Sequence, residues 1–382
     1  MPENNYWSHW EKTVFFDEID VAIIGGGIVG VNAAIRLREL KPDWRVTIIE
    51  RGILPLGAST KNAGFACFGS MTELLDDLKT QSEDEVFALV EKRWRGLQRL
   101  RSRVGEGALD YQSFGGYELF KATEKADFED CKNQLDHFNQ ILHPIIKEGN
   151  VFEIKDDKIG SFGFKQVSHL IHNKAEGQIN PGKMMKTLLN MARAAGVEIY
   201  SGMEVLDMEN TDKGVVLKCN HQLQIKAAKV LLATNGFAKR LLPELDVVPA
   251  RNQVLITEPI SGLALKGCFH YDKGYYYFRN VGNRVLIGGG RTLAKEEETT
   301  DQFGHTSIIR NALVSLLDTI VLPGVPYEID KGWSGILGVG SQKQPILSCI
   351  ENNIYTAVRL GGMGVAIGTL VGEEAADMMV NT

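Results

Sequence analysis

Three glycines and one glutamate have the residue types and the spacing needed to bind a dinucleotide. Residues 20–30 read DVAIIGGGIVG, so Gly25, Gly27 and Gly30 follow a strongly apolar run. In such a turn the first glycine permits the tight bend and the second lets a pyrophosphate approach the backbone, while the third lets the next helix pack closely. Glu50 ends a second apolar run, and a carboxylate there suits a ribose diol and would repel a 2′-phosphate. We therefore predict a dinucleotide site here, with a glycine-rich turn that holds no ligand as the alternative.

Three predicted elements must position these groups. The apolar pattern predicts a strand ending at residue 24, a helix over 28–40 and a strand over 45–49. The helix would point its free N–H groups and the positive end of its dipole at the phosphates. Beyond them the pattern predicts helices over 71–80, 83–104, 125–147, 182–196 and 306–320, strands over 198–200, 215–219, 224–227 and 229–232, and β-rich segments over 111–121 and 248–291. Six basic residues on the helix over 83–104 are interpreted as a solvated face, with a polyanion-binding surface as the alternative.

Composition places the chain among ordinary soluble globular proteins. Hydrophobic residues make up 44% and charged residues 24% of its 382 residues, and the formal net charge is −6. This charge argues against nucleic acid as a partner, and five scattered cysteines without a CxxC pair argue against a disulfide framework. The first 20 residues lack the basic flank and apolar run of a signal peptide, and the longest apolar stretch, over 21–35, is too short to span a bilayer. We expect a cytoplasmic protein with no membrane span.

Three further motifs are rich in small residues. Residues 57–65 read GASTKNAGF, residues 230–237 read VLLATNGF and residues 359–368 read RLGGMGVAIG. Small residues let backbone N–H groups or a helix N-terminus approach a flat, electron-rich ligand, although each motif alone is also compatible with a structural turn. Together and in this order the motifs resemble the D-amino-acid-oxidase-like family of FAD-dependent oxidoreductases, and the resemblance covers nearly the whole chain.

The resemblance implies a fold class and a domain organisation. It implies an α/β protein with a Rossmann-like FAD-binding domain of the glutathione-reductase type and an inserted α+β substrate domain built on an antiparallel sheet. We expect the discontinuous FAD-binding domain over 1–90, 150–245 and 332–382, and the substrate domain over 91–149 and 246–331. Because nucleotide-domain elements bracket the β-rich segments, the chain is expected to cross between the domains more than once.

The resemblance also implies the residues that bind FAD. The cofactor is expected to be held non-covalently, because Ser334 or Gly335 stands where sarcosine oxidases have a flavin-linked cysteine. The residues implied in FAD binding are Gly25, Gly27, Ile28, Gly30, Glu50, Arg51, Ser59, Thr60, Asn62, Ala63, Gly64, Val205, Ala233, Thr234, Gly236, Gly335, Gly361, Gly362, Met363 and Gly364.

The chemistry implied by the resemblance is oxidation of the C–N bond of a small-molecule amine or amino acid. A hydride passes from the carbon beside nitrogen to flavin N5, and the resulting imine hydrolyses. The sarcosine-oxidase lysine that assists reaction with oxygen is replaced near Leu286, so oxygen and another electron acceptor both remain open. No general base and no metal site is predicted, and His169 and His172 are interpreted as ordinary polar residues. A 2-hydroxy-acid dehydrogenase of the same fold and a flavoprotein that only transfers electrons are the alternatives.

One departure from the family concerns the substrate. Amino-acid oxidases of this group hold the substrate carboxylate with an arginine in a WAGLRP-like segment, and Leu337 stands at that position here. Either Arg279 or Arg359 holds the carboxylate instead, or the substrate has no carboxylate beside the reacting nitrogen, as in the branch of γ-glutamylputrescine oxidase. Tyr275, Tyr277 and Arg279 alternate along one predicted strand and are the candidates for the substrate pocket, with ordinary cross-strand packing as the alternative.

Overall fold

The first apolar run forms the central strand of a sheet, β1 (Ile19–Ile24), and five of its six residues are buried. The computed structural model describes residues 7–17, 19–147 and 149–382, so the signal-peptide prediction falls partly outside the described residues. In the sheet β1 pairs in parallel with β2 (Val46–Glu50) and with β11 (Gln224–Leu232). The strand order is β17 (Ile346–Glu351), β18 (Ile354–Val358), β11, β1, β2 and β8 (Glu198–Ser201), with β10 (Gly214–Cys219) and β9 (Val205–Thr211) extending antiparallel from β11.

Four helices bury their apolar residues against one face of this first sheet. They are α1 (Ile28–Leu40), α3 (Glu83–Val104), α7 (Pro181–Ala194) and α9 (Gly364–Asn381). The opposite face carries a second apolar cluster, in which Val215, Leu217 and Ile225 pack over the sheet. Because both faces of the parallel strands are buried, these strands are continuous apolar runs in the sequence.

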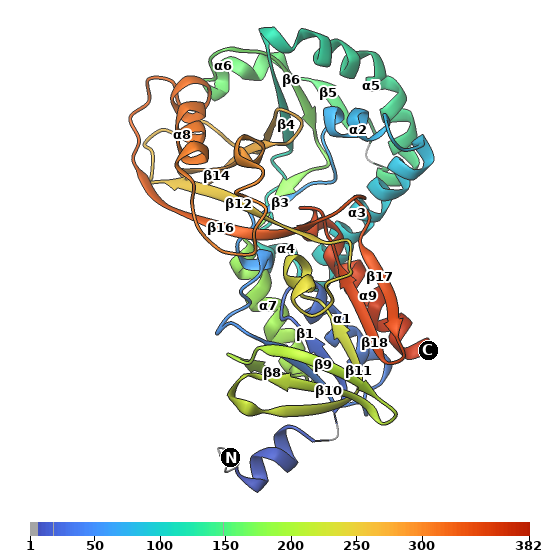
Figure 1. Ribbon diagram of the computed structural model, residues 1–382. Helices are drawn as coiled ribbons and strands as arrows, with labels where there is room; N and C mark the ends of the chain where they lie inside the picture. The colour runs from blue at the N-terminus through green and yellow to red at the C-terminus, as the bar shows by residue number, and fades with distance from the viewer. Residues whose placement is uncertain (1–6, 18, 148) are drawn as a thin grey trace.

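A second sheet of eight strands lies above the first in Figure 1. Its order is β16 (Ile329–Val339), β12 (Val248–Thr257), β15 (Arg284–Gly289), β14 (Tyr276–Val281), β13 (Cys268–Tyr271), β4 (Gly116–Lys121), β6 (Val167–Asn173) and β5 (Phe152–Ile154). Helix α8 (Ser307–Leu316) covers one face through a cluster that includes Phe269 and Phe278. On the other face α5 (Lys125–Ile146) covers the end at β4–β6–β5.

The α/β class is confirmed, and several element boundaries agree closely with the sequence pattern. The helix expected over 83–104 is α3, and the one expected over 125–147 is α5. The two short strands expected over 224–227 and 229–232 form one strand, β11. The helix expected over 306–320 ends as an α-helix at Leu316 and continues as a wider turn over Leu317–Val321.

The sheets divide the chain differently from the expected domain boundaries. Strands β5, β6 and β16 belong to the second sheet, although they were expected within the segments of the FAD-binding domain. Helix α3, most of which was expected in the substrate domain, is shared between the two sheets. Its residues Leu97 and Leu100 pack with α1 and α9 beside the first sheet, whereas Val86, Phe87 and Val90 pack with α5 and β4 of the second. The pairing partner of a strand is set by tertiary contacts, and the local pattern does not reveal it. In the described part of the chain, every helix is too short or too polar to cross a bilayer.

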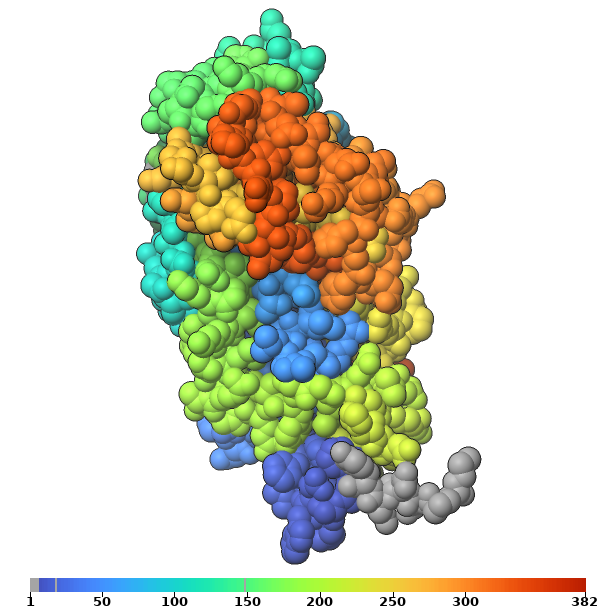
Figure 2. All heavy atoms as spheres, turned by 90° about the vertical axis from the view of Figure 1, so that its left-hand side faces the viewer, coloured from blue at the N-terminus to red at the C-terminus, as the bar shows by residue number. Residues whose placement is uncertain are grey.

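The segment that follows β2 lies at the surface between the two parts of the molecule. Figure 2 shows it in blue, with the part built on the second sheet above and the green segments around residues 180–220 below. Ile53 and Leu54 are 87% and 71% exposed there, whereas the strand before them is fully buried.

Candidate functional site

A cavity lies along the carboxyl ends of β1, β2 and β11, in front of the first turn of α1. Its empty volume is about 1150 Å³, counting open solvent at its mouth. Of the residues implied in FAD binding, those that line it are Gly25, Gly27, Ile28, Glu50, Arg51, Ser59, Asn62, Val205, Ala233, Thr234, Gly362 and Gly364. The structure therefore brings all four sequence motifs to one cavity at the strand ends, where ligands of open α/β sheets bind.

The glycine turn between β1 and α1 exposes backbone to this cavity. Gly25 has a φ of 110°, and its N–H donates to the carbonyl oxygen of Ile49 at 2.9 Å. A Cβ at Gly30 would lie 2.1 Å from the carbonyl oxygen of Gly25, so only glycine lets α1 pack this close to the turn. The Ile28 N–H donates to Ser59 Oγ at 2.9 Å, which places the hydroxyl of the second motif at the N-terminus of α1. These N–H groups and the helix dipole suit a pyrophosphate.

Glu50 is held in one position at the end of β2. One carboxylate oxygen accepts from the Gly26 N–H at 2.9 Å, and the other accepts from Gly52 N–H at 2.9 Å and from Leu56 N–H at 3.3 Å. The residue is 6% exposed and lines the cavity. A carboxylate fixed in this way can accept hydrogen bonds from a ribose diol, and it also braces the turn on either side of it.

One end of the cavity carries a stack of charged and aromatic groups. The Arg51 guanidinium lies 4.0 Å from the centroid of the Phe237 ring and pairs with Glu204 at 3.5 Å. Arg240 pairs with the same Glu204 at 3.3 Å and with Asp301 at 2.6 Å. Sequence reasoning named Arg51 here and missed Arg240, which no motif marked.

The end of β11 contributes a buried hydroxyl to the cavity wall, one helical turn from Phe237. Among the described residues Thr234 Oγ1 has no hydrogen-bond partner, and Thr234 lines the cavity at the end of β11. The next residue, Asn235, accepts through Oδ1 from the N–H groups of Arg359 and Leu360 at 3.1 and 3.2 Å, which ties the third motif to the fourth. Helix α9 begins at Gly364, so its N-terminus faces this end. An unsatisfied hydroxyl, a backbone turn and two helix N-termini fit FAD, whose pyrophosphate and flavin ring both accept hydrogen bonds.

The remaining residues implied in FAD binding do not line the cavity, and most of them support its wall. Thr60 Oγ1 donates to the carbonyl oxygen of Pro55 at 2.8 Å, and a Cβ at Gly236 would lie 2.5 Å from the carbonyl oxygen of Leu337. This group consists of Gly30, Thr60, Ala63, Gly64, Gly236, Gly335, Gly361 and Met363.

The three candidates for the substrate pocket have different surroundings. Tyr275 precedes β14 and is 45% exposed. The Tyr277 hydroxyl accepts from Asn252 Nδ2 at 3.2 Å, and its ring meets Phe65 edge-on at 5.5 Å between centroids. Arg279 donates from Nε to the carbonyl oxygen of Ala63 and from Nη2 to that of Ile179 at 3.0 Å. Only Tyr277 therefore presents a polar group beside the second motif without being tied to main chain.

Leu337 lines the cavity near the N-terminal turn of α9. It lies on β16 opposite Ala250 of β12, and its Cδ1 is 3.9 Å from the position of a Cβ at Gly362. The other arginine candidate, Arg359, donates from Nη1 to Asp246 Oδ2 at 2.6 Å and from Nε to the carbonyl oxygen of Gln344 at 2.9 Å. Both candidate arginines are thus used in holding the fold.

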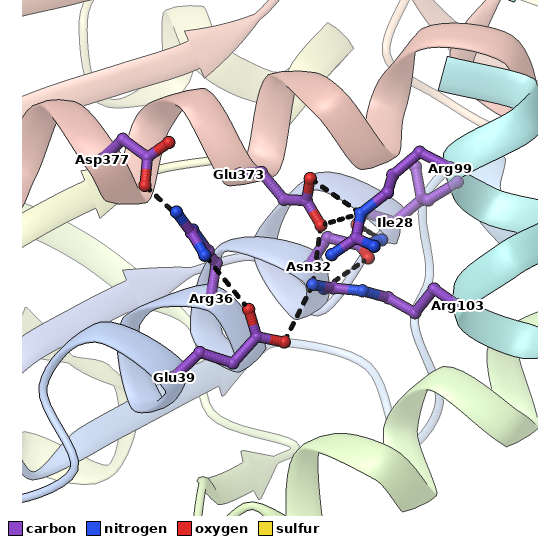
Figure 3. A network of polar contacts seen from close by, with 8 residues as sticks. All are labelled: Ile28, Asn32, Arg36, Glu39, Arg99, Arg103, Glu373 and Asp377. Carbon is purple, nitrogen blue, oxygen red and sulfur yellow. Dashed lines mark hydrogen bonds and ion pairs between the residues drawn. The ribbon is translucent and has the colours of Figure 1, made fainter. Parts of the chain in front are cut away.

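A polar network links α1, α3 and α9 (Figure 3). Its Asn32 and Arg103 side chains are buried, whereas the side chains at its rim are partly exposed. Arg103 of α3 donates to Asn32 Oδ1 at 3.1 Å, and Asn32 Nδ2 donates to the carbonyl oxygen of Ile28 at 2.8 Å. Arg103 also pairs with Glu373 of α9 at 2.6 Å, and Arg99 donates to the same carboxylate. The interpretation of the basic residues of α3 as a solvated face is therefore wrong for Arg103 and for Arg93, whose side chains are each 3% exposed. Arg99 pairs with Glu373 and is still 39% exposed. The network fixes the two helices whose N-termini face the cavity.

The histidines at a metal-like spacing point to separate carboxylates. His169 Nδ1 lies 2.8 Å from Asp156 Oδ2, and His172 Nδ1 lies 3.1 Å from Glu153 Oε1. Burial lowers the pKa of His172 more than Glu153 raises it, so its imidazole is predominantly neutral near pH 7.

Comparison with known proteins identifies similar chains of nearly the same length. A family model described as FAD dependent oxidoreductase matches residues 20–378. Glycine oxidase from Geobacillus kaustophilus is 25% identical, over 94% of this chain and 92% of its own, and gamma-glutamylputrescine oxidoreductase from Escherichia coli is 24% identical, over 94% and 83%. The crystal structure of the Geobacillus glycine oxidase superimposes on this chain with a TM-score of 0.75 at 21% identity, and the match covers 95% of each chain. That of L-proline dehydrogenase from P. horikoshii has a TM-score of 0.74 at 18% identity and covers 95% of this chain and 94% of its own.

Proposed function

The chain belongs to the D-amino-acid-oxidase (DAO) family of FAD-dependent oxidoreductases, and from this premise we propose that its substrate is an amine with no carboxylate beside the reacting nitrogen. When bound, FAD accepts a hydride from the carbon beside that nitrogen, and the resulting imine hydrolyses. The rest of the chemistry is binding and orientation by residues of this chain.

In this proposal, different residues at the cavity bind different parts of FAD. The glycine turn and α1 hold the pyrophosphate, Glu50 holds the adenosine ribose, and Thr234 and the N-terminus of α9 hold the flavin end. The inward face of β12, β14 and β16 then holds the substrate above the flavin, with Tyr277 as its polar group.

The observation that carries the proposal is that an apolar side chain, Leu337, lines the cavity near the N-terminus of α9. Leu337 occupies the position from which the family's arginine grips a carboxylate, and an alkyl side chain offers no hydrogen bond. Arg279 and Arg359 donate to main-chain carbonyl oxygens and, for Arg359, to Asp246. Releasing either guanidinium for a substrate would leave buried acceptors without partners.

The names of similar proteins agree with a nitrogen-bearing substrate. One relative is called glycine oxidase, whose named substrate has a carboxylate, and another is called gamma-glutamylputrescine oxidoreductase, whose named substrate ends in an amine. Leu337 favours the second kind of substrate for this chain. A third relative is called malate:quinone oxidoreductase, and a 2-hydroxy acid of that kind would also need a carboxylate grip.

Anaerobic reduction of the bound flavin tests the proposal. Purified protein is mixed with propylamine and with 2-aminobutyric acid, which differ only by the carboxylate, and with longer diamines and 2-hydroxy acids. We expect amines to bleach the flavin at least about tenfold faster than the matched amino acids, a difference of about 1.4 kcal/mol in the barrier. Faster bleaching by 2-aminobutyric acid or by a 2-hydroxy acid would contradict the proposal. The reduced protein is then mixed with air-saturated buffer or with a quinone. The faster return of the flavin colour shows whether oxygen or the quinone is the better electron acceptor.

A further inference from the structure

Three potential metal ligands from distant parts of the sequence meet beneath the second motif. Cys67 follows β3 (Phe65–Ala66), Glu176 precedes β7 (Gly177–Gln178), and His270 lies on β13. One ligand atom from each, the sulfur, a carboxylate oxygen and a ring nitrogen, lies within 4.8 Å of the other two. The residues are 6%, 1% and 8% exposed. A thiol, a carboxylate and an imidazole are together the donor set that zinc binds.

The distance between two of these atoms fits metal ligation better than a hydrogen bond. Glu176 Oε2 and His270 Nε2 are 3.4 Å apart, whereas a charge-assisted hydrogen bond brings such atoms to about 2.7–2.9 Å. Within the described part of the chain His270 Nε2 has no hydrogen-bond partner, although it is fully buried. In a tetrahedral zinc site, nitrogen and oxygen ligands at about 2.0–2.2 Å from the metal are roughly 3.3–3.5 Å from each other. The pair therefore has the spacing of two ligands of one ion.

We propose that Cys67, Glu176 and His270 bind one zinc ion. A zinc ion with a thiolate, a carboxylate and a neutral imidazole has no net charge, so the filled site is compatible with burial. Binding forms a zinc–sulfur bond and releases the thiol proton to solvent, with no change of oxidation state. The Phe68 N–H donates to Glu176 Oε1 at 3.2 Å and holds the carboxylate in orientation.

The position of the site indicates what the ion does for the fold. The Phe65 ring meets the His270 ring at 5.3 Å and the Tyr277 ring at 5.5 Å between centroids, so the ion lies beside the aromatic side chains of the second sheet. It joins the loop of the second motif to β13 and thereby holds the cofactor-binding part against the second sheet. Three protein ligands leave one coordination position for water.

Zinc content of the wild-type protein is the first test. The holoprotein is incubated with equimolar zinc, dialysed and analysed by mass spectrometry of its metals, with cadmium and manganese as comparison ions. We expect about one zinc per chain, and X-ray absorption at the zinc edge with one sulfur at about 2.3 Å and nitrogen or oxygen ligands at about 2.0 Å. A chain that retains no zinc, or a zinc without a sulfur ligand, overturns the proposal and leaves a buried ion pair of His270 and Glu176.

Single substitutions then assign the ligands. Cys67→Ser, Glu176→Gln and His270→Gln are each expected to lower the zinc content to below about a tenth of the wild-type value. The matched control is Cys268→Ser, a buried cysteine on the same strand as His270 whose thiol donates to the carbonyl oxygen of Gly177. Flavin content and circular dichroism identify variants that do not fold, and the absorption experiment on the wild type needs no variant. Equal zinc in His270→Gln and wild type also overturns the proposal. None of these results depends on which substrate the enzyme oxidises.

Discussion

The cofactor cavity and the inward face of the second sheet are built in different ways. One part of the cavity is made of backbone: the glycine turn at Gly25, the first turn of α1 and the N-terminus of α9. The inward face of the second sheet is made of side chains, among them Asn252, Tyr277 and Trp333, which come from three different strands. Backbone recognition tolerates sequence change and suits a cofactor common to a family, whereas side-chain recognition changes with single substitutions and suits a substrate.

The largest effect is expected where the backbone of the cavity is forced to move. Gly30→Ala places a Cβ 2.1 Å from the carbonyl oxygen of Gly25, and neither backbone can yield without opening the turn. We expect FAD affinity to fall at least about 100-fold, or about 2.7 kcal/mol, measured by flavin titration of the apoprotein. The control is Gly160→Ala, because Gly160 does not line the cavity and, among the described residues, nothing lies within 4 Å of a Cβ there. Unchanged affinity in Gly30→Ala would mean that the turn does not bind the pyrophosphate.

The second-largest effect tests whether the polar network of α1, α3 and α9 stabilises the fold that carries the cofactor cavity. Arg103→Met removes the cation between Glu373 and Glu39 and leaves each carboxylate with one arginine partner, Arg99 and Arg36 respectively. We expect a loss of roughly 2 kcal/mol in the free energy of unfolding, measured in urea with FAD bound. Lys79→Met removes an exposed ion pair with Asp76 and is expected to leave the free energy of unfolding nearly unchanged. Equal losses in the two variants would show that the network of Figure 3 adds no stability.

A substitution on the side-chain face should change which substrate is used. Leu337→Arg supplies a guanidinium at the flavin end, where a carboxylate could be held. We expect the ratio of flavin reduction rates for 2-aminobutyric acid over propylamine to rise at least about tenfold, which is 1.4 kcal/mol. Leu337→Met keeps an apolar side chain and should leave the ratio unchanged. A ratio that does not move in Leu337→Arg would mean that this residue does not face the substrate.

The smallest effect concerns one hydroxyl on the same face. Tyr277→Phe removes the acceptor of the hydrogen bond from Asn252, which is worth about 1 kcal/mol. We expect the amine concentration that half-saturates flavin reduction to rise about fivefold. Tyr275→Phe is the control, because Tyr275 is 45% exposed and precedes β14. Equal changes in the two variants would remove Tyr277 from the proposed pocket.

The difference between a local pattern and contacts between distant residues also explains which features the sequence could predict. The family and the α/β class are confirmed, because strand, glycine turn, helix and terminal acid are consecutive in the chain and their pattern is local. The placement of β5, β6 and β16 in the second sheet depends on pairing between residues far apart, which no local pattern encodes.

Side-chain partners were hidden for the same reason. Arg99 and Arg103 lie on a helix that reads as amphipathic, and their partner Glu373 is about 270 positions away. Arg279 and Arg359 are indistinguishable in the sequence from arginines free to bind a substrate, and only the fold shows their main-chain acceptors. The proposed zinc ligands have no spacing that a motif search could recognise, since each comes from a separate segment.

The cofactor cavity also has a consequence for biosynthesis. The turn before α1 is translated before the second sheet, whereas α9, which begins at Gly364, is translated after it. The whole second sheet, which starts at β4, is translated between them. A nascent chain therefore has only part of its FAD-binding site until α9 has been made, and flavin uptake can report when α1 and α9 have come together.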